Sequence, residues 1–394
     1  MLRALPGVGR FFAALFLLQA PALGADPPVR PLAWAESIGS PRPAALVKGR
    51  DRELASVCPE SDSALRTVAS QLATHTIAAD DVEAIAYALR AAGDPHVWPR
   101  AFLLEGRTID PAEARTRMKA WLGTFRPGAR LRCGIVTDRV GEKEVVAAVA
   151  IDAQADLASI PVRARASSWV DVDAKVLAQA SGAKVIVLGP TGATRTLLTS
   201  FSDGRIKART NVDHEGTWLF QVLLDGVNGP RPVLEAYVFV GVEPPAAQPN
   251  RPVPGEEAGT DGDAAGALTR MVMFARRSES LHGLVRDTSL DRLARSHAER
   301  MMRVKQVGHD VGDGDPKERL ERAGVSFPQI GENVAHAGNI VLAHRALWSS
   351  PSHRDNMLHP RFDRIGIGVA TDVDGSVWVT QLFATSAGEQ RPSR

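Results

Sequence analysis

One stretch of this sequence, residues 155–243, has no helical periodicity, and this most limits what the chain can fold into. Short runs of apolar and β-branched residues, such as Lys184–Leu188 and Val233–Val240, alternate there with turn clusters such as Asn-Gly-Pro at 228–230. Strands spaced about 8–12 residues apart, with no helix between them, are typical of an antiparallel sandwich. We therefore predict an all-β sandwich over 155–243.

The flanking segments differ from this stretch in composition. Residues 244–266 combine five prolines and four glycines with four acids, which predicts a linker too polar to bury. Residues 51–153 and 267–385 mix helical periodicity with short strands and are predicted to be α/β domains, whereas 25–50 is a proline-rich lead-in and 386–394 a tail. A length of 394 residues suits three such domains. The net charge of +2 excludes the basic surface of a nucleic-acid binder.

The first 24 residues resemble a secretory signal peptide. Two arginines lie near an apolar run, 11–18, which is followed by small residues at 22–24. Gln19 and Pro21 interrupt the run, so it is too short to span a bilayer, and no later segment is apolar enough to do so. We expect a secreted or periplasmic protein with no transmembrane segment after cleavage. In an oxidising compartment Cys58 and Cys133 would form one disulfide, and the alternative is two separate buried thiols.

The segment 267–385 holds seven of the ten histidines. A helix capped by Asp287 carries His297 on its apolar face, where we expect a core histidine satisfied by a neighbour. Beyond this helix, three polar motifs follow in order, together with one predicted helix and two predicted strands: Gly308-His309, Gly331-Glu332-Asn333-Val-Ala, a helix from Asn339 to Trp348, Ser350-Pro-Ser-His353-Arg, and strands at Ile365–Val369 and Val377–Ala384.

In the order and spacing of these motifs, residues 267–385 resemble the CAP superfamily, also called SCP, of cysteine-rich secretory, antigen 5 and pathogenesis-related 1 proteins, in its bacterial form. The resemblance implies an α-β-α sandwich with an open cleft that carries two histidines and two acids. His309 and His353 match the histidines and Glu332 the first acid. The position of the second acid falls near Ser350, so the expected tetrad is reduced to three residues.

Two imidazoles and one carboxylate would leave a fourth position open on a divalent ion, for which zinc is the most plausible metal. Glu332 could instead orient one imidazole without touching a metal. Because the family is better known for binding than for catalysis, the resemblance implies a binding module for a small lipid, glycan or cell-envelope ligand. The alternatives are a metal-assisted hydrolase and an envelope scaffold without chemistry. The remaining histidines of this segment are expected at the surface: His282, His336, His344 and His359.

Residues 51–153 repeat part of the C-terminal pattern. Asp62-Ser-Ala-Leu65 parallels Asp287-Thr-Ser-Leu290, and Leu131-Arg-Cys-Gly134 parallels Asp363-Arg-Ile-Gly366. We predict a degenerate CAP-like domain whose role is structural or partner-binding, because residues near Ala101 replace the Gly-Glu-Asn motif. The alternative is a chance likeness of generic helix and strand patterns. The predicted fold is thus α/β with a C-terminal CAP sandwich, preceded by an immunoglobulin-like β-sandwich and this N-terminal domain.

Overall fold

The computed structural model describes residues 32–43, 50–125, 130–226 and 229–386. All of them belong to one unit, Pro31–Arg394. The predicted signal peptide and nearly all of the predicted tail lie outside the described residues. Within the described ranges, no helix is both long and apolar enough to cross a membrane.

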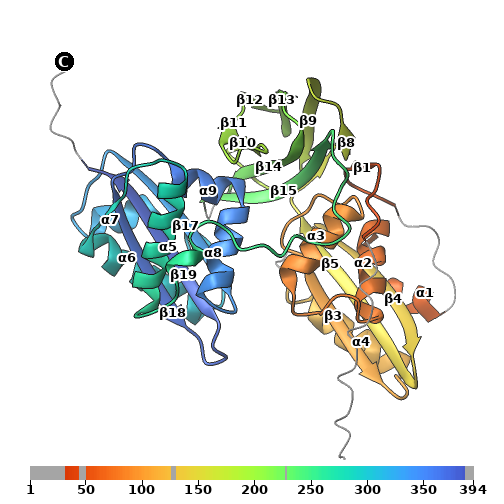
Figure 1. Ribbon diagram of the computed structural model, residues 1–394. Coiled ribbons are helices and arrows are strands. Elements are labelled where there is room, and N and C mark those ends of the chain that lie inside the picture. Colours follow the sequence, from red (N-terminus) through yellow and green to blue (C-terminus); the bar gives the residue numbers. More distant parts are fainter. Residues whose placement is uncertain (1–31, 44–49, 126–129, 227–228, 387–394) are drawn as a thin grey trace, which may run out of the picture. The chain divides into compact units, whose positions relative to one another are not determined.

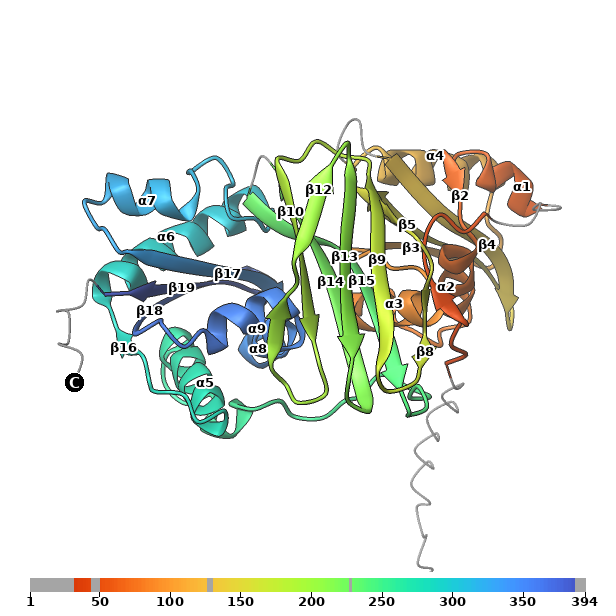
Figure 2. The same ribbon diagram turned by 90° about the horizontal axis from the view of Figure 1, so that it is seen from above.

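The C-terminal part is a sheet between two layers of helices (Figures 1 and 2). Its elements are η1 (Glu256–Ala258), α5 (Ala264–Ser278), β16 (Val285–Arg286), α6 (Thr288–Val304), α7 (Pro316–Arg322), β17 (Gln329–Ala337), α8 (Ile340–Ser349), α9 (Pro351–Leu358), β18 (Arg364–Thr371) and β19 (Val377–Thr385). The strand order is β16-β18-β19-β17.

Alternation along β19 explains the layering. Trp378 and Leu382 pack with α6 and α7 on one face, whereas Val379 and Phe383 pack with α5, α8 and α9 on the other. Both faces of the sheet are therefore buried, and the predicted α-β-α sandwich is confirmed. Figure 2 shows α6 and α7 on the opposite side of the strands from α5, α8 and α9.

Helix α6 lies directly on β18. The Asp287 carboxylate accepts hydrogen bonds from the backbone N–H groups of Ser289 and Leu290, at 2.8 and 3.1 Å, and so caps the helix. Glycines on the strand allow the close approach, because a Cβ at Gly368 would stand 2.1 Å from the backbone nitrogen of Arg295. The local sequence thus sets where the helix begins and how closely it packs.

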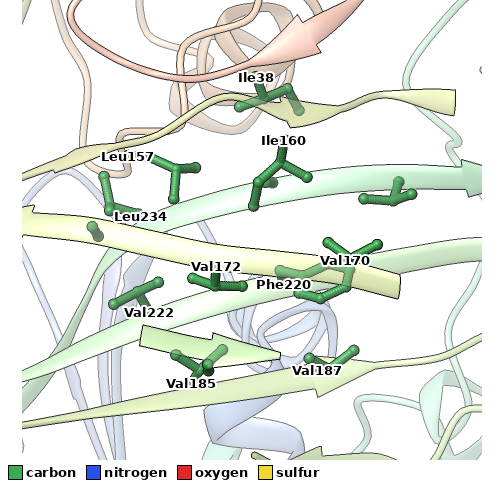
Figure 3. Close-up of a cluster of buried hydrophobic side chains, with 14 of the residues drawn as sticks. Ile38, Leu157, Ile160, Val170, Val172, Val185, Val187, Phe220, Val222 and Leu234 are labelled. Carbon is green, nitrogen blue, oxygen red and sulfur yellow. The ribbon is translucent and has the colours of Figure 1, made fainter. Parts of the chain in front are cut away.

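The middle part consists of two facing sheets, ordered β11-β10-β14-β15-β8 and β12-β13-β9-β6. Val185, Phe220 and Val222 of the first sheet meet Val170 and Val172 of the second in one buried core (Figure 3). The predicted sandwich is present, and its immunoglobulin-like character stays a prediction. Its strands are β6 (Ala155–Leu157), β7 (Ile160–Pro161), β8 (Arg163–Ala164), β9 (Ser168–Val176), β10 (Gly182–Leu188), β11 (Thr194–Thr196), β12 (Thr199–Ser202), β13 (Arg205–Val212), β14 (Gly216–Gly226) and β15 (Gly229–Val240).

The N-terminal part has a sheet ordered β2-β4-β5-β3. Helices α2 and α3 cover one face and α1 and α4 the other. Cys58 and Cys133 form a disulfide with Cα atoms 6.0 Å apart. The elements are β1 (Ser37–Ile38), α1 (Arg50–Ala55), β2 (Glu60–Ser61), α2 (Ser63–Ala73), α3 (Val82–Ala91), β3 (Arg100–Gly106), α4 (Pro111–Leu122), β4 (Arg130–Val140) and β5 (Lys143–Ala153).

The N-terminal and C-terminal sheets share their pairing pattern. In each sheet a two-residue strand, β2 or β16, pairs in parallel with a long strand, β4 or β18. The long strand forms an antiparallel hairpin with the next strand, β5 or β19, which also pairs with the remaining strand, β3 or β17. The capping residue Asp62 precedes α2 as Asp287 precedes α6. Gly134 meets α2 as Gly366 meets α6, since an added Cβ would lie 1.9 and 2.3 Å from the helix backbone.

The second half of the predicted linker contacts the predicted CAP domain, although most residues between 255 and 266 stay exposed or partly exposed, and its last three residues belong to α5. Glu256 pairs with Arg345 of α8 at 2.7 Å, and Nε2 of His344 lies 2.9 Å from the carbonyl oxygen of Pro254. These partners replace the water that the polar groups would lose. His344, expected at the surface, is fully buried by the same contacts.

Candidate functional site

The fold brings the three predicted site residues together from separate elements. His309 lies in the loop after α6, Glu332 on β17 and His353 in the first turn of α9. Nδ1 of His309 is 2.8 Å from Oε1 of Glu332. His353 is joined to the strand that carries Glu332, because the Asn333 amide donates to the carbonyl oxygen of His353 at 3.0 Å.

Glu332 is held as an ionised carboxylate. Its side chain is 1% exposed, and burial alone would raise its pKa. The hydrogen bond from His309 and the positive charge of Arg319 outweigh burial, so that the pKa lies below its ordinary value. Because an ionised carboxylate only accepts hydrogen bonds, Nδ1 of His309 donates to it, and Nε2 is the remaining nitrogen of the ring.

Arg319 is a site residue that the sequence analysis missed. Its guanidinium donates to the second oxygen of Glu332 and to the carbonyl oxygens of His309 and Gly314, both at 2.6 Å. It thus ties the His309 loop to β17. No sequence spacing links residues 319 and 332, and the capping box at the start of α7 favours a solvated helix.

His353 has a different environment. Burial, and next the charge of His309, lower the pKa of His353 to about 3. Its ring is therefore neutral at physiological pH. The helix that carries it is tied to the Gly-Glu-Asn motif, because the amide of Asn333 donates to the carbonyl oxygen of His353 at 3.0 Å. The Asn356 amide also donates to the carbonyl oxygen of Glu332 at 3.1 Å.

Ser350, at the position where the second acid was expected, is part of a polar group beside α9. Its hydroxyl oxygen lies 3.1 Å from Nε2 of Gln221 and 3.3 Å from the hydroxyl oxygen of Ser352. Ser350 ends α8 and is also the residue from which α9 starts.

The residues present fit a divalent ion only in part. Across the described ranges, no group of three or more His, Cys, Asp or Glu side chains is arranged to hold a metal ion. Both oxygens of Glu332 are engaged by His309 and Arg319, which suits the orienting role. His309 and His353 would supply two nitrogen ligands, and water or a bound ligand would complete the coordination.

The other histidines of this part take structural positions. His297 is fully buried, with Nδ1 2.8 Å from Asp313 and Nε2 2.9 Å from the carbonyl oxygen of Gly308, which confirms the expected core histidine. His282 and His336 are exposed and His359 is partly buried. His336 stacks on Trp378 with ring centroids 4.1 Å apart.

Comparison with known proteins agrees with the fold and the motifs. The model of the cysteine-rich secretory protein family, CAP, matches residues 270–383. A curated relative, the uncharacterized protein YkwD of Bacillus subtilis, is 30% identical over 110 residues, which are 27% of this chain and 42% of that protein. The matched segment thus spans less than half of the relative's length. Residues 270–383 form a bacterial CAP domain.

Two solved structures are also similar to parts of this chain. An outer surface protein of Borrelia burgdorferi is 21% identical and covers 32% of this chain and 96% of its own, with a TM-score of 0.31. An extracellular protein containing an SCP domain from Bacillus anthracis is 14% identical and covers 59% of this chain and 86% of its own, with a TM-score of 0.30.

Proposed function

We propose that this chain is an exported binding protein whose CAP domain takes a small lipid, glycan or other cell-envelope ligand at His309 and His353. The geometry of the site carries the proposal, because Nδ1 of His309 lies 2.8 Å from the Glu332 carboxylate and the backbone of His353 is tied to the same strand. An imidazole with a pKa of about 3 offers a lone pair to a hydrogen-bond donor or a metal, but it is too weak a base for efficient proton transfer near neutral pH. This chemistry favours binding over a hydrolase.

We include a divalent cation, with zinc the most plausible, in the proposed site. Neutral imidazoles are the preferred nitrogen ligands of zinc, and Glu332 would fix the orientation of the His309 ring. Such an ion would supply a positive charge that attracts the phosphate, carboxylate or hydroxyl oxygens of an envelope ligand. The protein would supply the two imidazoles and the hydrogen bonds that hold them.

The test compares the full chain with a His309→Ala/His353→Ala variant and with His336→Ala, which removes an exposed histidine outside the site. We expect the wild type and the control to bind Zn²⁺ in isothermal titration calorimetry, and the double variant to lose this binding. Equal zinc binding by all three would overturn the metal part of the proposal. If the wild type turns over an envelope or peptide substrate and Glu332→Gln does not, the protein is a hydrolase instead. If the wild type neither binds a ligand nor turns over a substrate, the protein is a scaffold.

We also propose that residues 51–153 are a degenerate CAP-like domain. The strand registers support it, because Val149 pairs with both Gly134 and Ala101, just as Leu382 pairs with both Gly366 and Glu332. Ala101 thus stands at the position of Glu332. Because a copy without this acid is not expected to bind zinc, changing its one exposed histidine, His75, to alanine should leave the zinc binding of the full chain unchanged.

A further inference from the structure

The helix that carries His353 is capped from outside the CAP domain. Ser350 is at the N-cap position of α9, where a serine hydroxyl ordinarily accepts a hydrogen bond from the helix backbone, but it makes no such bond. The backbone N–H of Ser352 instead donates to Oε1 of Gln221, at 3.0 Å. Gln221 belongs to β14 of the β-sandwich and is fully buried.

The orientation of the Gln221 amide is set by its neighbour on β15. Nε2 of Gln221 donates to Oε1 of Glu235 at 2.8 Å, which points Oε1 of the amide at Ser352. The other carboxylate oxygen of Glu235 pairs with Arg90 of α3 at 2.9 Å. A chain of polar contacts therefore runs from α3 through the sandwich to the first turn of α9.

The sandwich touches the site at two more positions. The Thr194 hydroxyl donates to the Asp355 carboxylate in the second turn of α9 at 2.6 Å. Gly229, at the start of β15, lies over the other histidine, since an added Cβ would be 3.1 Å from the Cβ of His309. The elements that carry both histidines of the site are thus in contact with the sandwich.

We propose that Gln221 is a positioning residue for the CAP site, through which the β-sandwich holds α9 and hence the His353 ring in place. The proposal rests on the proposed function, because it concerns the same pair of histidines. An orphan N–H in the first turn of a short helix needs a partner, and here the partner comes from a residue 131 positions away. Binding at the CAP site then depends on the docked sandwich.

The test compares the full-length wild type with four variants. Gln221→Leu removes the cap at similar volume, and Gln221→Glu places a second carboxylate beside Glu235. The exchange Gln221→Glu/Glu235→Gln restores a carboxylate–amide pair with an acceptor facing Ser352. Val172→Ala weakens the sandwich core away from α9 and is the matched control. Zn²⁺ affinity is measured by calorimetry, and the order of α9 by hydrogen–deuterium exchange.

We expect Gln221→Leu to weaken Zn²⁺ binding roughly tenfold, the effect typical of residues that orient metal ligands, and to speed exchange in α9. Gln221→Glu should also weaken Zn²⁺ binding and speed exchange in α9. The exchanged pair, which recovers the hydrogen bond to Ser352, should return the Zn²⁺ affinity and the exchange rate to within about twofold of the wild type. Val172→Ala should lower the thermal midpoint without changing either readout.

Two results would overturn the proposal: unchanged exchange in α9 of Gln221→Leu, or an equal loss in Val172→Ala. If the wild type binds no Zn²⁺, the metal part of the proposed function fails, whereas faster exchange in α9 of Gln221→Leu alone would still support the positioning role.

Discussion

Replacing Arg319 by methionine should be among the most damaging single changes in the CAP domain. The guanidinium is 6% exposed and serves the Glu332 carboxylate and two backbone carbonyls. Methionine keeps the apolar stem but leaves a buried carboxylate without its cation. Breaking a buried ion pair by removing one partner costs roughly 3–5 kcal/mol, most of it the desolvation of the charge left behind. We expect a loss of this size.

Urea unfolding followed by tryptophan fluorescence measures the effect, because Trp348 and Trp378 lie in the CAP domain core. A Glu332→Leu/Arg319→Met double variant removes both charges and should cost less than the sum of the two single changes. Glu318→Gln, in the exposed capping box of α7, is the control and should cost about 1 kcal/mol or less. A loss below 1 kcal/mol for Arg319→Met, or strict additivity in the double variant, would refute this reasoning.

Three further predictions concern acid stability, packing and the disulfide. Because folding lowers the pKa of Glu332, the ionised carboxylate contributes its full stabilisation above pH 4.5, the ordinary value, and loses it as the pH falls through the lower pKa of the folded state. The difference in unfolding free energy between the wild type and Glu332→Gln should therefore shrink below pH 4.5 in an acid titration. Gly368→Ala should destabilise the CAP domain by about 3 kcal/mol in urea, since α6 must move. Gly338→Ala should be nearly neutral, because the added Cβ would make only an ordinary van der Waals contact with Leu342, at 3.6 Å. Cys58→Ser removes the disulfide between residues 75 positions apart and should lower the free energy of unfolding by about 4 kcal/mol. The thermal midpoint of this variant should no longer depend on reductant, and an unchanged midpoint relative to the wild type would refute the stabilising role of the disulfide.

The parts of the fold that local chemistry specifies could be predicted from the sequence. Asp287 determines where α6 begins, and this predicted start agrees with the structure. The paired pattern at Asp62 and Gly134 also anticipated a sheet covered on both faces. A helix cap depends on residues within one turn of each other, and the pattern at Asp62 and Gly134 emerges when two stretches of the chain are compared, so the sequence alone reveals both.

The site itself could not be derived from spacing. His309, Glu332 and His353 are more than 19 residues apart from one another, and only the resemblance to a known family grouped them. Arg319 and Gln221 were missed because an arginine on a capped helix and a glutamine in a strand carry no signal of burial. Each is buried because partners from other elements satisfy its polar atoms, which is a property of the tertiary fold.

The anchored linker has a consequence for how the sandwich and the CAP domain associate. Ala246 accepts a hydrogen bond from the backbone N–H of Leu32. Asn250, Pro254 and Glu256 contact α8, so the tether between the two anchored ends is residues 247–249. A tether this short keeps two surfaces at an effective concentration in the millimolar range. The few hydrogen bonds at Gln221 and Thr194 would be too weak to hold a separate sandwich and a separate CAP domain together. Because the tether joins the two domains, the same bonds can keep them docked and still allow them to separate.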